Sequence, residues 1–265
     1  MRPFGFIRLY REDVGFLHRL YYRLAGVAVD NKLHFLYLTR FVRKHVDRPL
    51  AGPILDAGCE YGDYSFYFAD RYPGCEVLGI DIVGQCIDQN DRLLPRTGLD
   101  NLRFEQADIC EIECRDRFGF ICCIDVLEHI PDQTRAIENL HRALQDGGSL
   151  FVHIPLARRR PVVFDRYLTE FHEWAEHEHI AEEHTRDSIE ALFEECGFRV
   201  VASESTFHHY LGELAVSILM LFYGNTAFNR AVLALLTPLL WVLVRLDVAI
   251  PFENGNAVAL LLQKE

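Results

Sequence analysis

The chain has 265 residues, of which 50% are hydrophobic and 25% are charged. This composition supports a buried core, and it excludes a disordered chain, a collagen or a miniprotein held by disulfides. The 27 Lys and Arg against 39 Asp and Glu leave a net charge of −12. An acidic chain repels phosphate backbones and anionic lipid headgroups, so we expect no nucleic-acid partner.

Cysteine usage and the first residues both indicate a cytoplasmic protein. None of the 8 cysteines forms a CxxC pair, and Cys122 and Cys123 are adjacent within an apolar run. In a strand their side chains would point to opposite faces, so we interpret them as reduced thiols of the core. The first residues lack a long apolar stretch followed by a small-residue cleavage site, so no signal peptide is expected.

The first expected element is a helix over residues 31–47, where apolar residues recur at helical spacing ahead of Pro49. From Pro53 onward, short β-rich runs alternate with helical ones. Strands are expected at residues 53–58, 76–82, 101–109, 118–127 and 149–155, with helices from about Asp63, Gly84 and Pro131. Strands that are apolar throughout and alternate with helices indicate a parallel sheet covered on both faces.

The alternation ends after residue 155. Residues 155–184 are polar and predict a long excursion above the sheet. An amphipathic helix over 186–196 follows, with Thr185 as its N-cap and Gly197 after its last turn. Further strands are expected at 198–207 and 256–264.

Between these last two strands lies an apolar insertion. Residues 211–223 and 228–246 are two apolar helical runs in a place where a short turn would have been enough. The stretch between Arg230 and Arg245 has 14 residues and is interrupted by Pro238, which we take as too short to cross a bilayer. We interpret the insertion as a buried helical cap, and leave open a homodimer interface or a peripheral membrane contact.

A glycine-containing turn follows the first expected strand, where residues 54–62 read ILDAGCEYG. Glycines let a backbone approach a ligand closely, and the N-terminus of the next helix offers free N–H groups. Asp81 ends the second strand, where an acid accepts hydrogen bonds from two ribose hydroxyls. Nicotinamide and S-adenosylmethionine enzymes both use such an acid, so these residues alone leave the two classes open.

Four motifs in order resemble the class I S-adenosylmethionine-dependent methyltransferases, in the subgroup that includes quinone-biosynthesis enzymes. The turn DAGCEYG is similar to the loop under the methionine part of the cofactor, and IDI around Asp81 is similar to the ribose-binding acid. QADI, with Asp108, resembles the motif that meets the adenine. DVLEHI, from Asp125 to Ile130, resembles the exit of the fourth strand. The resemblance covers residues 54–199.

The resemblance implies a Rossmann-like, doubly wound α/β fold with a mostly parallel seven-stranded sheet whose last strand is antiparallel. It implies S-adenosylmethionine as cofactor. From the residue pattern as a whole we divide the chain into an N-terminal helical lid (1–48), the cofactor-binding core (49–207), the apolar cap (208–255) and the final core strand (256–265). The cofactor-binding residues that the resemblance implies are Asp56, Gly58, Glu60, Gly62, Asp81, Ile82, Asp108, Ile109 and Asp125.

One residue departs from the family pattern. Glu60 stands where the family has its middle glycine. We expect Glu60 to keep a negative φ and to turn its side chain away from the ligand. The alternative is a fold that binds the cofactor without transferring its methyl group and serves as a partner or regulatory subunit.

Ligands of open α/β sheets bind at the carboxyl ends of the strands, which directs attention to Asp125, Glu128, His129 and His153. His129 is the leading general base because the ordinary pKa of histidine, about 6.5, suits proton removal near neutrality. Its alternative role is to orient the start of the following helix. His179 is the second base, because in the resembling subgroup a histidine before the penultimate helix often faces the substrate.

Several histidines and glutamates accompany His179, and a divalent metal is an alternative for them. Without a CxxC or HExxH pattern we interpret the stretch as a solvated, acidic lid, and we expect no metal. The expected reaction moves a methyl group to oxygen, or alternatively to nitrogen or carbon, of a small acceptor. The apolar insertion favours a hydrophobic or lipid-linked acceptor.

Overall fold

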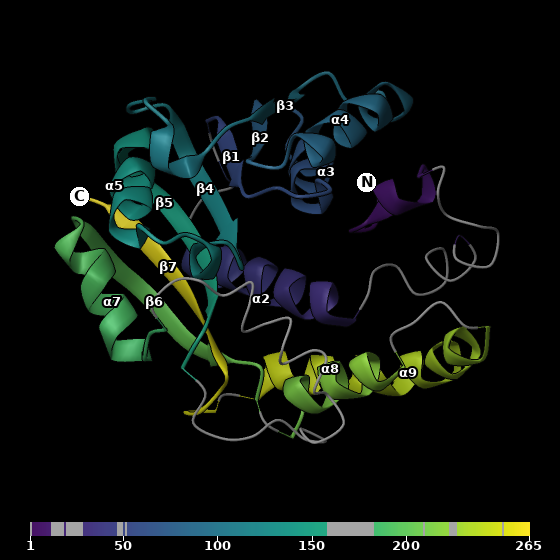
Figure 1. Ribbon diagram of the computed structural model, residues 1–265. Helices are drawn as coiled ribbons and strands as arrows, with labels where there is room; N and C mark the ends of the chain where they lie inside the picture. Colours follow the sequence, from purple (N-terminus) through teal and green to yellow (C-terminus); the bar gives the residue numbers. More distant parts are fainter. Residues whose placement is uncertain are drawn as a thin grey trace.

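The computed structural model describes residues 2–11, 29–46, 52–157, 183–208, 210–222, 227–250 and 252–265, together with Arg19 and Leu50. Its centre is a seven-stranded sheet with the strand order β3-β2-β1-β4-β5-β7-β6 (Figure 1). The strands are β1 Ile54–Ala57, β2 Val77–Asp81, β3 Leu102–Gln106, β4 Phe118–Ile124, β5 Leu144–Pro155, β6 Phe198–Thr206 and β7 Ala257–Lys264.

The pairing of the strands confirms the predicted fold class. Strand β1 lies parallel to β2 on one side and to β4 on the other, and β4 is parallel to β5. Strand β7 runs antiparallel to both β5 and β6. The order of the sheet therefore reverses between β1 and β4, which is where open α/β sheets bind their ligands.

The helices follow the predicted alternation. They are α2 Val29–His45, α3 Asp63–Arg71, α4 Gly84–Leu93, α5 Gln133–Ala143, α7 Arg186–Glu195, α8 Gly212–Leu221 and α9 Ala227–Ala249, with the 3₁₀ turns η1 Phe6–Leu9, η2 Leu94–Arg96, η3 Ile109–Glu111 and η4 Leu127–His129. The predicted cap of α7 is confirmed, since the Thr185 side chain accepts a hydrogen bond from the Ser188 backbone.

Two hydrophobic cores lie on the two faces of the sheet. Helices α2, α3 and α4 contribute to one core, and α5 and α7 contribute to the other. The neighbours Cys122 and Cys123 are both fully buried and belong to different cores. Their prediction as core thiols on opposite faces of one strand is confirmed, because side chains alternate along a strand.

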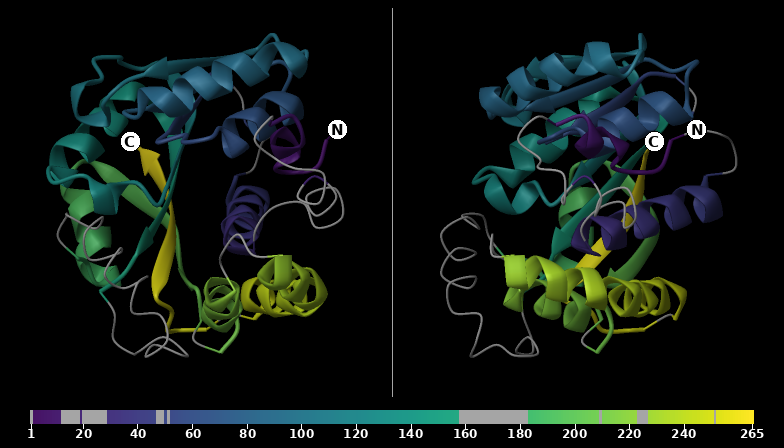
Figure 2. Two further views of the ribbon diagram at one scale, coloured as in Figure 1. Left: turned by 45° about the vertical axis from the view of Figure 1, so that its right-hand side comes forward. Right: turned by 90° about the vertical axis from the view of Figure 1, so that its right-hand side faces the viewer.

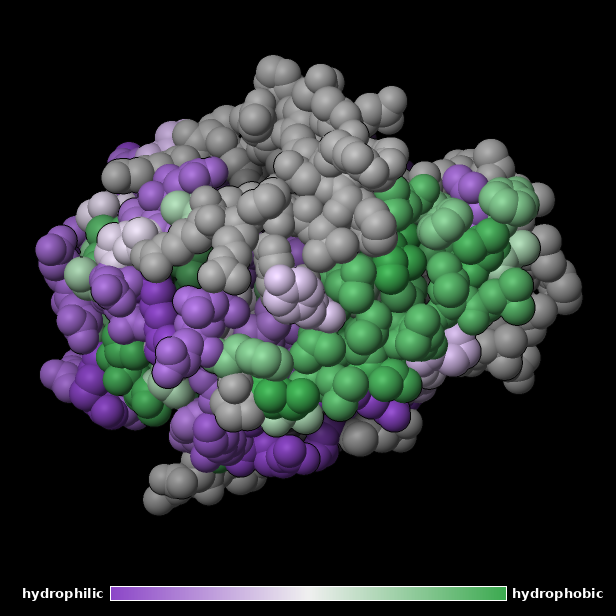
Figure 3. Space-filling model, turned by 90° about the horizontal axis from the view of Figure 1, so that it is seen from below, coloured by the Kyte–Doolittle hydropathy of each residue, from purple (hydrophilic) through white to green (hydrophobic). Residues whose placement is uncertain are grey.

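Helices α8 and α9 form an additional layer that packs on α2 (Figure 2). Phe41 of α2 is fully buried against Phe151 of β5, with ring centroids 5.7 Å apart. Leu240 and Val244 of α9 are fully buried in the same core. One side of α9 is therefore buried against the domain, whereas its other side presents an apolar surface (Figure 3). The role of the insertion as a cap stays a prediction. The domain boundaries themselves stay a prediction.

Pro238 does not interrupt the apolar run. It lies inside α9, which has 23 residues, and the neighbouring Thr237 hydroxyl donates a hydrogen bond to the Leu233 carbonyl at 2.7 Å. A proline in a helix removes one backbone donor without ending the helix when neighbouring elements hold it in place. The expectation that this run is too short to cross a bilayer is thus wrong. Ala231–Ala249 is long and apolar enough, by length and composition, to cross a membrane.

Candidate active site

A cavity of about 740 Å³ lies at the carboxyl ends of β1 and β4, where the order of the sheet reverses. The loops that follow the first four strands and the first turns of α2 line it. Its volume is in the range of sites that hold a small molecule or a cofactor. The topology of the sheet thus places the cavity where the sequence motifs predict a cofactor.

The loop between β1 and α3 bends tightly along one wall of this cavity. Gly58 has φ +77° and Gly62 has φ +75°, a left-handed conformation that glycine adopts easily. A Cβ atom on Gly58 would come within 2.3 Å of Val126 Cγ2. Only glycine therefore lets this loop lie so close to the residues after β4.

Glu60 corrects the expectation of a negative φ. Its φ is +44°, so the loop keeps a left-handed conformation at the residue that replaces the family's glycine. This conformation costs a side-chain-bearing residue about 1–2 kcal/mol. Two hydrogen bonds hold the residue in place: its N–H donates to Asp81 Oδ2 at 2.8 Å, and its carbonyl accepts from Asn90 Nδ2 at 2.8 Å.

Asp81 and the residues after it fit the ribose and adenine of S-adenosylmethionine. The two carboxylate oxygens of Asp81 accept backbone hydrogen bonds from Glu60 and Val83, which fixes the carboxylate at the cavity wall. Ile82 and Val83 line the cavity and are 62% and 48% exposed. A fixed carboxylate beside exposed apolar side chains suits two ribose hydroxyls next to an aromatic base.

Most of the predicted cofactor-binding residues meet at this cavity. It is lined by Asp56, Gly58, Glu60, Asp81, Ile82, Asp108, Ile109 and Asp125, whereas Gly62 does not line it. Asp108 accepts a hydrogen bond from the Cys110 backbone at 2.8 Å, which caps η3. Burial raises the pKa of Asp56 to about 7, although Ser65 donates a hydrogen bond to it at 2.5 Å. Their roles toward a cofactor stay a prediction.

A row of polar side chains in close contact closes the other end of the cavity. His34 of α2 places its Nε2 3.0 Å from Asp125 Oδ2, and His153 Nδ1 lies 2.6 Å from Asp125 Oδ1. His153 Nε2 lies 2.9 Å from the hydroxyl of the buried Thr206. The two imidazole rings are 4.4 Å apart. One carboxylate thus orients two histidines, one of which lines the cavity.

The pKa shifts in this row indicate which of its groups are ionised near neutrality. Burial raises the pKa of Asp125, but His34 and His153 outweigh this effect and leave the pKa well below its ordinary value. Burial lowers the pKa of His153 even though Asp125 opposes that shift. We therefore assign a charged Asp125 and a neutral His153 at pH 7. Asp125 also has φ +51°, a strained conformation of the kind found at functional sites.

His129 and Tyr64 share the cavity with His34. His129 ends η4, and its backbone N–H donates to the Val126 carbonyl at 3.0 Å, a bond of the turn that does not involve its side chain. Its catalytic role stays a prediction. The Tyr64 hydroxyl is buried and makes no hydrogen bond within the described ranges. A buried donor of this kind at a cavity wall is suited to a polar atom of a bound molecule.

The remaining predicted residues lie elsewhere. His179 falls outside the described residues. Glu128 is buried and does not line the cavity, and burial raises its pKa well above the ordinary value. His184 is also buried, with its Nε2 2.6 Å from Gln133 Oε1, so this member of the expected lid is part of the packed structure.

The same row is the one group in the described part of the chain with the spacing to hold a metal ion. The ligand atoms of His34, Asp125 and His153 all lie within 4.8 Å of one another. Two histidines and a carboxylate are a common ligand set. His153 already makes hydrogen bonds to Asp125 and Thr206, so the geometry does not require a metal.

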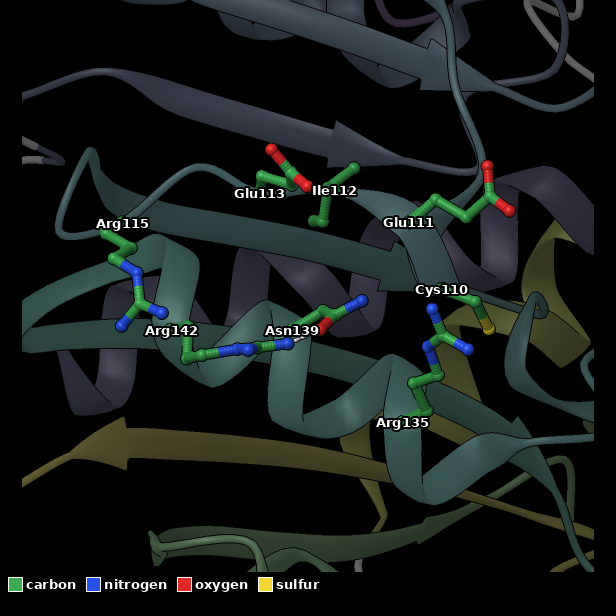
Figure 4. Close-up of a pocket in the computed structure, with 8 residues that line it drawn as sticks. All are labelled: Cys110, Glu111, Ile112, Glu113, Arg115, Arg135, Asn139 and Arg142. Atoms are coloured by element: carbon green, nitrogen blue, oxygen red, sulfur yellow. Dashed lines mark hydrogen bonds between the residues drawn. The ribbon is translucent and has the colours of Figure 1, made fainter.

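A second hollow of about 370 Å³ lies on the outer side of α5 (Figure 4). Arg135 of α5 lies beside Cys110 at one end, and Arg115 and Arg142 lie toward the other. Arg142 donates a hydrogen bond to Asn139. Glu111 and Glu113 also line the hollow, and this mixture of exposed charges gives it no defined ligand.

Sequence reasoning missed His34 because its contact with Asp125 depends on how α2 crosses the sheet. A signal was nevertheless present. His34 lies in one helical stripe with Tyr37, Leu38 and Phe41, all of them buried. A histidine within the apolar face of a helix needs a buried polar partner, and Asp125 is that partner here.

The comparisons with known proteins agree on one family. The profile of a methyltransferase domain matches residues 22–203. Over 112 residues, 41% of this chain and 40% of the relative, the chain is 34% identical to a trans-aconitate 2-methyltransferase of Deinococcus radiodurans. Over 100 residues it is 36% identical to a ubiquinone biosynthesis O-methyltransferase of Coxiella burnetii, covering 37% of this chain and 41% of that one. The match thus spans about two fifths of each relative.

The fold is shared with solved methyltransferase structures. One is phosphoethanolamine N-methyltransferase 2 of Haemonchus contortus in complex with S-adenosyl-L-methionine. The two structures align with a TM-score of 0.59 and 15% identity, covering 96% of this chain and 61% of that one. At this identity the likeness concerns the fold alone.

Proposed function

Because this chain belongs to the methyltransferase domain family, we propose that it transfers the methyl group of S-adenosylmethionine to an oxygen of a small acceptor. Membership confirms the resemblance that the motifs predicted. It also supports the enzyme class and S-adenosylmethionine as the cofactor. The atom that is methylated, the acceptor and the residues that assist transfer are the content of the proposal.

One observation carries the proposal. A single cavity joins the end that fits a nucleoside, at Asp81 and Ile82, with an end that carries the oriented His34–Asp125 pair. The bound cofactor supplies an electrophilic methyl group, whose bond to sulfur breaks as the bond to the acceptor forms. The protein has to hold the acceptor in line with that bond and remove its proton.

His34 is the residue that we propose for proton removal, with His129 as the second choice. A general base works best when a third group orients its ring and stabilises the protonated form. Asp125 lies 3.0 Å from His34 Nε2 and is positioned for both tasks. The proton leaves the acceptor hydroxyl for the imidazole, and the charge of Asp125 then balances the imidazolium.

The apolar insertion favours a hydrophobic or lipid-linked acceptor. Helices α8 and α9 pack on α2, the helix that also supplies Asn31 and His34 to the cavity. We propose that the acceptor holds its hydroxyl group at His34 and extends an apolar tail toward this layer. The methylated product is accordingly expected to be extractable into organic solvent.

The test supplies methyl-tritiated S-adenosylmethionine with a panel of phenols and carboxylic acids, each in a short form and in a prenylated form. We expect tritium in the organic phase, with equimolar S-adenosylhomocysteine and a preference for prenylated acceptors. Transfer to amines but not to hydroxyls would contradict the choice of oxygen. Binding of the cofactor without transfer to any acceptor would favour the alternative, a fold that binds S-adenosylmethionine and acts as a partner or regulatory subunit.

A further inference from the structure

One side of α9 is an exposed apolar surface that runs along the whole helix. The exposed large side chains of α9 and of the residue that follows it are Phe228, Leu235, Leu239, Val242, Leu246 and Ile250, with exposed fractions between 40% and 82%. Their spacings of 7, 4, 3, 4 and 4 place them on one helical face. We call these six residues the α9 face.

The α9 face is continuous with other apolar surface on the same side of the molecule. Seen from below, where Figure 1 places α8 and α9, hydrophobic residues cover a wide connected area (Figure 3). Phe252, three residues after the end of the helix, is 43% exposed. Isolated exposed apolar residues are common, but a row of this length marks an interaction surface. A helix of 23 residues extends the row over roughly 35 Å.

The opposite side of α9 is held firmly in the core. Asp247 is fully buried, and its carboxylate accepts hydrogen bonds from the Tyr37 hydroxyl at 2.7 Å and from the Gly212 N–H at 2.8 Å. His208 adds a backbone N–H at 3.0 Å. Crossing a membrane would break these contacts and place Asp247 in hydrocarbon. Helix α9 can therefore lie on a bilayer but not span it.

Charge distinguishes the α9 face from the rest of this acidic chain. Among the exposed residues of α9 with a described side chain, Arg245 is the one charged residue, and none is acidic. Arg245 makes no ion pair with a residue of the described ranges. A cation beside an apolar row complements an anionic, apolar surface.

We propose that the α9 face binds the surface of an anionic phospholipid bilayer. The six apolar side chains enter the boundary between headgroups and acyl chains, and Arg245 lies against the lipid phosphates. Binding is peripheral and reversible, so a protein of the cytoplasm could meet a lipid-linked molecule at the membrane. The proposal does not rest on methyl transfer, because lipid binding is measured without an acceptor.

The experiment is flotation of the full chain with vesicles of phosphatidylcholine alone and with vesicles that contain phosphatidylglycerol. The wild type should float with the anionic vesicles, and less so at high salt. Leu239→Asp should weaken this binding about tenfold or more, because it replaces an inserted side chain by a charge. Arg245→Glu should weaken it about fivefold or more, and only on anionic vesicles.

Controls separate lost binding from lost structure. Leu239 is 53% exposed, so Leu239→Asp should melt and bind S-adenosylmethionine like the wild type. Thr134→Asp adds the same charge at an exposed position of α5, in the layer on the other face of the sheet, and should float like the wild type. Arg115→Glu is the matched control for Arg245→Glu, because it makes the same change of charge away from the α9 face. It should float like the wild type.

Two outcomes would overturn the proposal. One is a wild type that fails to float with anionic vesicles, or a Leu239→Asp variant that floats equally well. The other is a concentration-dependent dimer in light scattering that Leu239→Asp abolishes while vesicles bind neither protein. That result would assign the α9 face to a second copy of the chain.

Discussion

His34 Nε2 lies 3.0 Å from Asp125 Oδ2, and this contact joins the N-terminal helix to the end of the fourth strand. Helix α2 does not only cover the sheet, because it also brings a titratable ring to a cavity lined mainly by the loops after the first four strands. The same carboxylate holds His153, which in turn meets Thr206. Residues far apart in the sequence, from His34 to Thr206, thus hold the Asp125 carboxylate and its two histidines in place.

The first prediction concerns proton removal. His34→Gln should lower turnover with a hydroxyl acceptor by about 10²–10⁴, the usual contribution of a general base, while leaving cofactor affinity nearly unchanged. Calorimetry with S-adenosylmethionine and the tritium assay measure the two quantities. His45→Gln, on the same helix, is the control, and His129→Gln tests the second choice.

The pH profile separates a catalytic role from a structural one. If His34 removes the proton, the remaining activity of His34→Gln should rise toward high pH, where the acceptor ionises by itself. Equal loss at every pH, together with a lower melting temperature, would identify His34 as a residue of the packing. Full activity in both histidine variants would remove the general base from the mechanism.

The second prediction concerns the cofactor. Asp81→Ala should weaken binding of S-adenosylmethionine and of S-adenosylhomocysteine by about 1.5–3 kcal/mol, the size expected for hydrogen bonds to a charged group. Because Asp81 also accepts two backbone hydrogen bonds, Asp81→Asn is the milder companion that keeps one acceptor oxygen. Asp88→Ala on α4 is the matched control. Unchanged affinity in Asp81→Ala would place the ribose elsewhere.

The sequence was informative wherever a function depends on residues close together in the chain. The strands, the turn at Gly58 and the acid at Asp81 were all predicted, because periodicity and motif spacing are local properties. The same holds for Asp108 and Asp125, which follow their strands directly and therefore reach the same edge of the sheet.

What the sequence could not show depends on tertiary packing. The partner of His34 is known only once α2 is placed across the sheet. The left-handed φ of Glu60 results from the hydrogen bonds that Asp81 and Asn90 make to it, which override the preference of a residue with a Cβ atom. The apolar run of α9 likewise divides into a buried side and an exposed side only when α2 and α8 pack against it.

The third prediction is a dependence of stability on pH. Burial raises the pKa of Asp56 to about 7 in the folded protein, whereas an unfolded aspartate titrates near 3.9. Between these values the folded state binds more protons, so this residue lowers stability as pH rises, by up to about 1.4 kcal/mol per pH unit. Below the unfolded pKa the effect vanishes.

Asp56→Asn removes this contribution. Urea unfolding of the protein without cofactor, at pH 4.5 and pH 7.5, should show that the variant loses less stability on going to the higher pH than the wild type does. The difference between the two proteins isolates Asp56, because every other titrating group is common to both. Equal losses would mean that Asp56 is already ionised in the folded protein at the lower pH.

The last prediction tests whether the helical layer and the sheet unfold together. Asp247 is fully buried and joins α9 to Tyr37 of α2 and to Gly212 at the start of α8. Asp247→Asn keeps the volume but loses the charge that accepts these bonds, and it should cost about 2–4 kcal/mol. Tyr37→Phe removes one donor and should cost about 1–2 kcal/mol.

Since α2 also belongs to the core of the sheet, we expect one cooperative transition in calorimetry at a lower temperature for both variants. The double variant should be less destabilised than the sum of the singles, because both changes affect the same hydrogen bond. A separate transition at lower temperature, with the unfolding transition of the cofactor-binding core left in place, would instead show that α8 and α9 unfold as an independent unit. The position of α2 against the sheet, and with it the position of His34, would then not depend on Asp247.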